Sequence, residues 1–201
     1  MIQILAISGS LRAASTNTVL LNATAALAPK NLKVIVYTSL ADLPHFNPDL
    51  DNDTPKAVKD FRSQLAKSAG VIISSPEYAH GVPGVLKNAL GWLVASGELY
   101  EKPVALFSAS PRATFAQASL TLTLSVMSVR LIKEASVVVP LLDKKPDESS
   151  VLADLGMSKA IHSALVAFGH AIDLAGTESK QNMIGDNRTD HCTETGGQKK
   201  K

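Results

Sequence analysis

The chain has 201 residues, of which 45% are apolar and 19% are charged, and its formal net charge is +2 at pH 7. This length and composition predict one globular domain and exclude an intrinsically disordered chain. The small net charge, without a basic stripe, gives nucleic-acid binding no electrostatic support. A single cysteine excludes an internal disulfide and a cysteine-based zinc site. No apolar run suits a transmembrane helix or a signal peptide, so we expect no membrane association and a cytoplasmic location.

Short apolar runs alternate along the chain with longer segments of helical spacing. In chain order we expect a strand over 2–7, a helix over 17–27, a strand over 32–37, a helix built on Val58, Phe61 and Leu65, a strand over 71–74, a helix over 84–95, a strand over 103–107, a helix over 113–127, a strand over 134–139 and a helix over 158–175. Nearly continuous apolar strands joined by helices predict an α/β fold with a five-stranded parallel sheet covered on both faces. Two doubly wound strand orders are common, and periodicity alone leaves the choice open.

The C-terminal segment differs from the rest of the chain. From Thr177 onward the sequence is polar and has almost no apolar spacing, and it ends in three consecutive lysines. We therefore expect a folded domain over 1–176 and a polar, disordered tail over 177–201.

The loop between the first strand and the first helix has the composition of an anion site. Parallel α/β sheets bind phosphate at this position, where the backbone N–H groups of the helix start are available. The loop contains an arginine and four short polar side chains that can donate hydrogen bonds: Ser10, Arg12, Ser15, Thr16 and Asn17. It lacks the Gly-Lys-Ser/Thr of a P-loop and the three glycines of a dinucleotide fingerprint. A small phosphate monoester such as FMN fits, although helix caps and a solvated arginine would explain the same residues.

The loops after the third and fourth strands offer the remaining candidates. Residues 74–84 contain two prolines and two glycines, which favour an extended backbone that a flat heteroaromatic ring could lie against, although such clusters are also ordinary in loops. Within this loop, Tyr78 offers an aromatic side chain, and Glu77 is either a general acid or base or, as we favour, a carboxylate that fixes the loop or caps a helix. In the loop 108–112, hydroxyl groups could close a third side of the site. The histidines show no metal-ligand spacing, so we expect no metal site.

Together these residues resemble a known family. The motifs are Gly9-Ser10-Leu11-Arg12-x-x-Ser15-x-Asn17, Pro76-Glu77-Tyr78, Pro83-Gly84-Val85-Leu86-Lys87-Asn88-Ala89-Leu90-x-Trp92 and Ala41-Asp42-Leu43-Pro44. In this order and spacing they are similar to the NADPH-dependent FMN reductases, a family that includes chromate and quinone reductases. Gly91 departs from the pattern, because these proteins usually have an aspartate before the tryptophan.

The resemblance implies a flavodoxin-like three-layer sandwich with strand order 2-1-3-4-5, bound FMN, and a homodimer or homotetramer. Ser10, Arg12, Ser15 and Asn17 would hold the FMN phosphate. Pro76, Glu77 and Tyr78 would line the isoalloxazine ring, and Ser110 would lie near it.

The expected function is that of an oxidoreductase. NADPH or NADH would reduce the bound FMN, which would reduce a small acceptor: a quinone, free flavin, an azo compound or a metal oxyanion such as chromate. Because a flavin can perform hydride chemistry, no catalytic side chain is required. The alternatives are a flavodoxin-type electron carrier and a non-catalytic flavin-binding protein.

Overall fold

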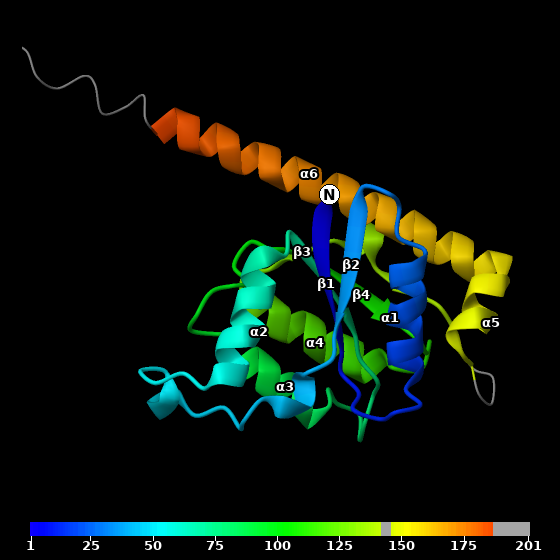
Figure 1. The fold of residues 1–201 in the computed structure, drawn as a ribbon, viewed down its shortest axis with the longest axis horizontal. Coiled ribbons are helices and arrows are strands. Elements are labelled where there is room, and N and C mark those ends of the chain that lie inside the picture. Colours follow the sequence, from blue (N-terminus) through cyan, green and yellow to red (C-terminus); the bar gives the residue numbers. More distant parts are fainter. Residues whose placement is uncertain (142–145, 187–201) are drawn as a thin grey trace, which may run out of the picture.

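The computed structural model describes the backbone of residues 1–141 and 146–186, with side chains up to residue 177, and it contains one parallel sheet (Figure 1). The strands are β1 (Ile2–Ser8), β2 (Leu32–Tyr37), β3 (Gly70–Ser74), β4 (Pro103–Ser108), β5 (Arg130–Leu131) and β6 (Val137–Val138). Their order is β2-β1-β3-β4-β5, and β6 also pairs with β4. The predicted flavodoxin-like α/β fold and its strand order are therefore confirmed.

Helices cover both faces of the sheet. They are α1 (Thr16–Ala26), α2 (Lys56–Lys67), α3 (Gly84–Gly91), α4 (Thr114–Val126), α5 (Glu148–Ala153) and α6 (Leu155–Asp186). Three short 3-10 turns also occur: η1 (Leu40–Asp42), η2 (Pro48–Leu50) and η3 (Lys133–Ala135). No helix in the described ranges is both long and apolar enough to cross a membrane.

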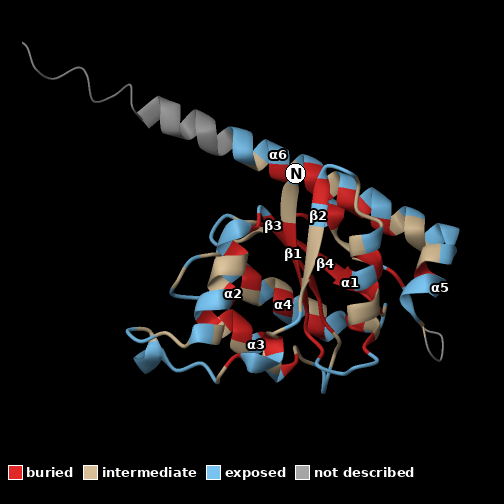
Figure 2. Cartoon of the chain, in the orientation of Figure 1, coloured by how far each residue is buried: buried red, intermediate tan, exposed pale blue. Residues whose placement is uncertain are grey.

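Alternation along the strands divides the core into two layers. Ile4 and Ala6 of β1 face a layer formed with α1, α5 and α6, whereas Leu5 and Ile7 face the layer formed with α2, α3 and α4. Figure 2 shows the central strands as buried along most of their length. Because both faces are covered, β1, β3 and β4 are apolar along nearly their whole length, as expected for buried parallel strands.

The fifth strand differs from the prediction. The sequence predicts one strand over 134–139, but this part of the sheet edge consists of two dipeptides, β5 and β6, on either side of η3. A side chain replaces the missing ladder bond, because the backbone N–H of Leu106 in β4 donates to Ser136 Oγ at 3.0 Å. The Ser136 hydroxyl in turn donates to the Ile132 carbonyl at 2.9 Å, so both groups are satisfied without a continuous strand.

Two helix ends also differ from the prediction. The α3 helix ends at Gly91 and not at residue 95. A Cβ atom at Gly91 would lie 3.2 Å from the ring of Phe46. The α6 helix begins at Leu155, is 32 residues long and continues to Asp186, so residues 177–186 are helical where we expected disorder. Glutamate, lysine, glutamine and methionine in this segment favour helix, and polarity alone does not prevent it. Residues 187–201 of the expected tail lie outside the described residues.

The interrupted edge predicts a measurable role for Ser136. Replacing Ser136 with alanine leaves the buried Leu106 N–H without its acceptor, so the free energy of unfolding should fall by about 1–2 kcal/mol. Urea denaturation measures this change, with the exposed Ser163→Ala variant on α6 as a control expected to change stability by less than about 0.5 kcal/mol. Equal stability of the two variants would contradict a structural role for this hydrogen bond.

Candidate active site

Three serines mark the carboxyl ends of the central strands. Ser8, Ser74 and Ser108 are the last residues of β1, β3 and β4, and all three are buried. In the parallel register Ser8 lies opposite Ser74, so the loops that follow β1 and β3 leave the sheet side by side. Doubly wound sheets bind their ligands at this edge.

The first loop approaches the second at Gly9. Its backbone N–H donates to the Ser74 carbonyl at 2.8 Å. A Cβ at Gly9 would lie 3.0 Å from Leu86 and 3.1 Å from Ser75, so only glycine permits this approach without a shift of the neighbours. The first loop, residues 10–15, is thereby held next to the end of β3.

The start of α1 is arranged to meet an anion. Ser15 caps the helix, since its Oγ accepts the backbone N–H of Thr18 at 3.4 Å. The first turn contains no acidic residue that would oppose the partial positive charge of the helix end. The buried Asn17 accepts the Ser74 hydroxyl at Oδ1 over 2.9 Å, which leaves its amide nitrogen as the group that can donate to a ligand.

The second loop contains a tight turn that presents Tyr78. Tyr78 and Gly81 exchange backbone hydrogen bonds of 3.1 and 3.0 Å, and the two residues between them, Ala79 and His80, have φ of 50° and 56°. Left-handed backbone is costly for non-glycine residues, and such strain is frequently found at functional sites. Tyr78 is half exposed, and its hydroxyl lies 3.4 Å from Ser10 Oγ, so the first and second loops are in contact.

Glu77 caps α4 from a distance. The residue at the N-cap position of this helix, Ala113, has no side chain that can cap it, and Glu77 Oε2 instead accepts the backbone N–H of Ala116 at 2.9 Å. This hydrogen bond, and a weaker contribution from His80 at 3.2 Å, hold the pKa of the Glu77 carboxyl below its ordinary value. The charged carboxylate is the form that a helix cap requires, and the hydrogen bond to Ala116 agrees with the preferred interpretation of Glu77 as a cap.

A cavity of about 290 Å³ lies where the three loops that follow β1, β3 and β4 meet, and these are the first, second and third loops. It is lined by five of the nine predicted site residues, Thr16, Asn17, Pro76, Glu77 and Ser110, together with Ser75, Ala109, Arg112 and Ala113. Ser10 and Arg12 line a neighbouring cavity of about 260 Å³ that extends to the end of β2. Ser15 is buried beneath the loop as a cap, and Tyr78 reaches Ser10 from the second loop.

Four residues of this cavity were not among the predicted site residues, and two of them, Ser75 and Arg112, have polar side chains. Ser75 comes directly after β3, and Arg112 follows β4 within the third loop. Their positions after the carboxyl ends of two central strands are the signal that could have identified both. No group of three or more potential metal ligands occurs within the described residues.

The tryptophan motif fastens the segment that follows η1 to the helix α3. Trp92 is fully buried, and its indole N–H donates to the Pro44 carbonyl at 2.8 Å. Asn88 donates to the same carbonyl at 3.0 Å and accepts the backbone N–H of Phe46 at 2.7 Å. The segment after η1 is therefore fastened to α3, and the ring of Phe46 packs where a side chain at position 91 would stand.

The fold and these loops define a flavodoxin-like protein with a polar site at the carboxyl edge of its sheet. Residues 2–142 match the family of NADPH-dependent FMN reductases, and the chain belongs to this family, which confirms the resemblance. It is a family of oxidoreductases.

Curated relatives agree with the family. The chain is 40% identical over 91 residues to a 2-hydroxy-1,4-benzoquinone reductase of a Burkholderia species, covering 45% of this chain and 49% of that protein. It is 34% identical over 113 residues to a quinone reductase of Escherichia coli, covering 54% and 60%. An NAD(P)H-dependent FMN reductase of Pseudomonas aeruginosa is 30% identical over 172 residues, covering 83% of this chain and 92% of the relative. The chain thus spans about half to three fifths of the first two relatives and most of the third.

Solved structures show the same fold. FerB, a flavoenzyme NAD(P)H:(acceptor) oxidoreductase from Paracoccus denitrificans, superimposes with a TM-score of 0.76 at 26% identity, covering 88% of this chain and 98% of that one. An NADH:FMN oxidoreductase solved in its apo form gives a TM-score of 0.60 at 23% identity, covering 84% and 88%, and supports the fold alone.

The capping role of Glu77 predicts a pH-dependent loss of stability. Because its folded-state pKa is lowered, its contribution is complete above the ordinary carboxyl pKa and disappears as the pH falls through the folded-state value. Glu77→Gln should lower the Tm at pH 7, and the difference from the unmodified protein should shrink as the pH is lowered through this range. Thermal unfolding from pH 7 to pH 3 measures it, and a difference that does not depend on pH would contradict the assignment.

Proposed function

We propose that the chain binds FMN at the carboxyl edge of its sheet and reduces a small acceptor at the expense of NADPH or NADH. The observation that supports this most strongly is the cavity formed by the loops after β1, β3 and β4, with the start of α1 and the Asn17 amide directed to it. A phosphate and a flat ring need different surroundings, and the adjoining loops offer both.

The first loop has the donors that a phosphate group requires. Ser10, Arg12, Thr16 and Asn17 would hold the FMN phosphate together with the backbone N–H groups at the start of α1, whose first turn contains no carboxylate. Ser15 would contribute by capping the helix and so fixing the orientation of those N–H groups. The Ser74 hydroxyl would orient Asn17 so that its amide nitrogen faces the phosphate.

The second and third loops would hold the flavin ring. Pro76 and Glu77 line the cavity together with Ser110, and Tyr78 closes the contact with the first loop. When bound, FMN would supply the hydride chemistry, so the side chains here orient the ring and exclude water. Glu77 would act as a positioning residue, because its carboxylate already accepts the Ala116 N–H at the start of α4.

A quinone is the acceptor that we favour, with free flavin as the second choice. The two first relatives are named as quinone reductases and the third as an FMN reductase, although the aligned segments cover only part of the first two proteins. Azo compounds and metal oxyanions such as chromate remain acceptors to be assayed beside them.

Steady-state kinetics test the proposed activity. The purified protein, supplied with FMN, is assayed for NADPH and NADH oxidation with 1,4-benzoquinone or free FMN as acceptor. If the oxidised nicotinamide leaves before the acceptor enters, double-reciprocal plots at several acceptor concentrations should be parallel. Intersecting lines would contradict this exchange, and no turnover with any acceptor would contradict the enzyme assignment. A flavodoxin-type carrier would bind FMN without oxidising NADPH.

The two loop arginines allow a sharper test of how FMN binds. Arg12→Met should weaken FMN binding about tenfold or more, because a hydrogen-bonded charge on phosphate is lost, while the Kd for riboflavin, which has no phosphate, should not change. Arg112 lines the cavity of the three loops, so Arg112→Met should weaken the binding of FMN and of riboflavin by a similar factor and should also raise the KM for NADPH, since this arginine would meet the nicotinamide cofactor. Fluorescence titration and initial rates measure these constants. A loss of FMN affinity that spares riboflavin, in the Arg112 variant alone, would reverse the two roles.

We also propose that two copies of the chain associate through α4. Phe115, Leu122 and Val126 repeat at helical spacing on its outer face and are 59%, 68% and 78% exposed. Val94 and Tyr100, in the connection that follows α3, are each 65% exposed. Exposed apolar residues that share one face are typical of an interface between subunits.

A charge on this face should prevent the association. Leu122→Glu is expected to convert the dimer into a monomer, because the carboxylate would be buried without a partner. Light scattering after size-exclusion chromatography measures the mass, with the exposed Lys159→Glu on α6 as the control that should remain dimeric. A monomeric unmodified protein would contradict the proposal.

A further inference from the structure

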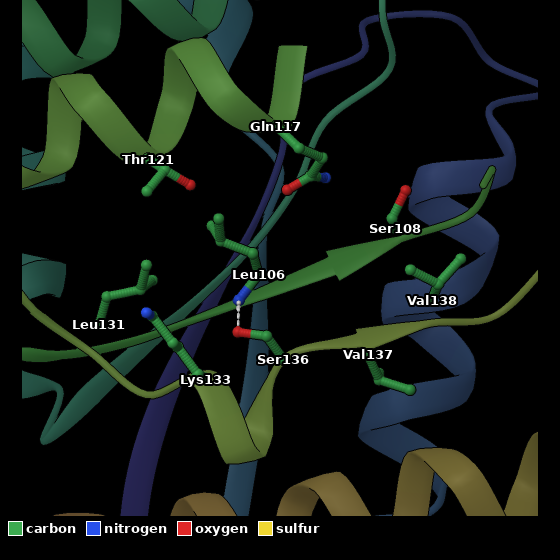
Figure 3. Close-up of a pocket in the computed structure, with 9 residues that line it drawn as sticks. All are labelled: Leu106, Ser108, Gln117, Thr121, Leu131, Lys133, Ser136, Val137 and Val138. Atoms are coloured by element: carbon green, nitrogen blue, oxygen red, sulfur yellow. Dashed lines mark hydrogen bonds between the residues drawn. The ribbon is translucent and has the colours of Figure 1, made fainter. Parts of the chain in front are cut away.

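A further cavity lies at the interrupted sheet edge, separate from the site described above. It has a volume of about 350 Å³ and lies between α4 and the strands β4, β5 and β6 (Figure 3). None of its lining residues also lines the cavity at the three loops. Ser108 shows why, since its side chain lies on the α4 side of β4, whereas Ala109 faces the opposite layer of the core.

The break between β5 and β6 opens this cavity. At η3 the chain leaves the sheet, and the Ser136 hydroxyl takes the place of a strand by accepting the Leu106 N–H. Side chains of Leu106, Leu131 and Val138 form apolar walls around the resulting space, whereas the Val137 side chain packs in the opposite layer of the core. Its volume is at the lower end of the range found for small-molecule sites.

Two unused donors point into this apolar space. Gln117 of α4 has its side-chain nitrogen buried, and within the described residues this atom has no hydrogen-bond partner. Lys133 of η3 lines the same cavity and forms no ion pair with a described carboxylate. Leaving a buried amide N–H unpaired costs free energy, so a ligand that supplied an acceptor would be favoured here.

Two of the other polar groups of the lining are already occupied, and the Thr121 hydroxyl remains as a third group that can donate. The Ser136 hydroxyl donates to the Ile132 carbonyl, and the Ser108 hydroxyl donates to the Ser110 carbonyl at 2.8 Å. The lining contains no carboxylate. The free donors include the amide of Gln117 and the ammonium group of Lys133, and the walls around them are aliphatic. This combination favours a ligand that has an anionic acceptor at one end and an apolar body.

We propose that this cavity is a binding site for a small aliphatic carboxylate. The carboxylate accepts hydrogen bonds from Gln117 Nε2 and the Lys133 ammonium, and the hydrocarbon chain packs against Leu106, Leu131 and Val138. This site does not depend on FMN or on the proposed reductase activity, because it shares no residue with the cavity at the three loops.

Hexanoate is a suitable probe, because an aliphatic chain matches the walls and, unlike an aromatic acid, has no ring to stack on a flavin. Titration of the ¹⁵N-labelled protein should shift the side-chain amide signal of Gln117 and saturate with a Kd of about 1 mM. Hexanol, which has the same chain without the charge, should bind about tenfold more weakly or worse.

Variants test the two donors separately. Lys133→Met should weaken hexanoate binding about tenfold or more, while Lys159→Met, an exposed lysine on α6, should leave it unchanged. Gln117→Met should also weaken binding, and it should keep or raise the Tm because it removes an unpaired buried amide.

Several results would overturn this proposal. They are the absence of a saturable shift at Gln117, an equal Kd in the Lys133→Met and Lys159→Met variants, and hexanoate binding that excess FMN abolishes. The last result would place the probe in the cavity at the three loops.

Discussion

The site depends on the parallel register of β1 and β3. Because Ser8 lies opposite Ser74, the two loops that follow these strands begin at the same level and touch within one residue, where the Gly9 N–H donates to the Ser74 carbonyl. The Ser74 hydroxyl then fixes Asn17 in the first turn of α1. A slip of one residue would direct each strand's side chains to the opposite face, so the buried apolar pattern of both strands also fixes the geometry of the loops.

Around this edge the structure uses side chains to satisfy backbone groups that the regular elements leave free. Glu77 caps α4 from the second loop, and Ser136 replaces a strand at the sheet edge. Asn88 and Trp92 fasten the segment that contains Pro44 through its carbonyl oxygen. Each contact joins segments that are distant in sequence, so the loops around the site are fixed by long-range hydrogen bonds and not by local preference alone. A ligand would therefore meet loops that are largely preorganised, which lowers the cost of binding.

The sequence was sufficient to predict the parts of the fold that depend on continuous apolar runs. The first four strands, the parallel sheet and the meeting of the loops follow from period and topology, because such strands must be covered on both faces. The family resemblance then selected the strand order. The fifth strand was not predictable in the same way, since its interruption depends on a hydrogen bond from Leu106, 30 residues away, to Ser136. Residues 177–186 were judged by polarity, although their helix propensity is adequate.

Prediction of the site was limited by the direction in which side chains point. Residue types in the first loop indicated an anion site, but sequence cannot show that Arg12 lies toward the end of β2 while Arg112 joins Asn17 in the cavity of the three loops. The preference for Glu77 as a cap agrees with its hydrogen bond to Ala116, yet the helix that it caps could not be identified before the third loop was placed. The sequence shows which residues follow the end of each strand. It does not show which of the resulting loops contact one another.

The central claim is that the first loop holds a phosphate and the second loop a flavin ring. A crystal structure of the protein with FMN tests this most directly. The account predicts the phosphate at the start of α1, within hydrogen-bonding distance of Asn17 and Arg12, and the ring along Pro76, Glu77 and Tyr78. FMN bound at any other place on the chain, or crystals that remain free of flavin after soaking, would contradict it.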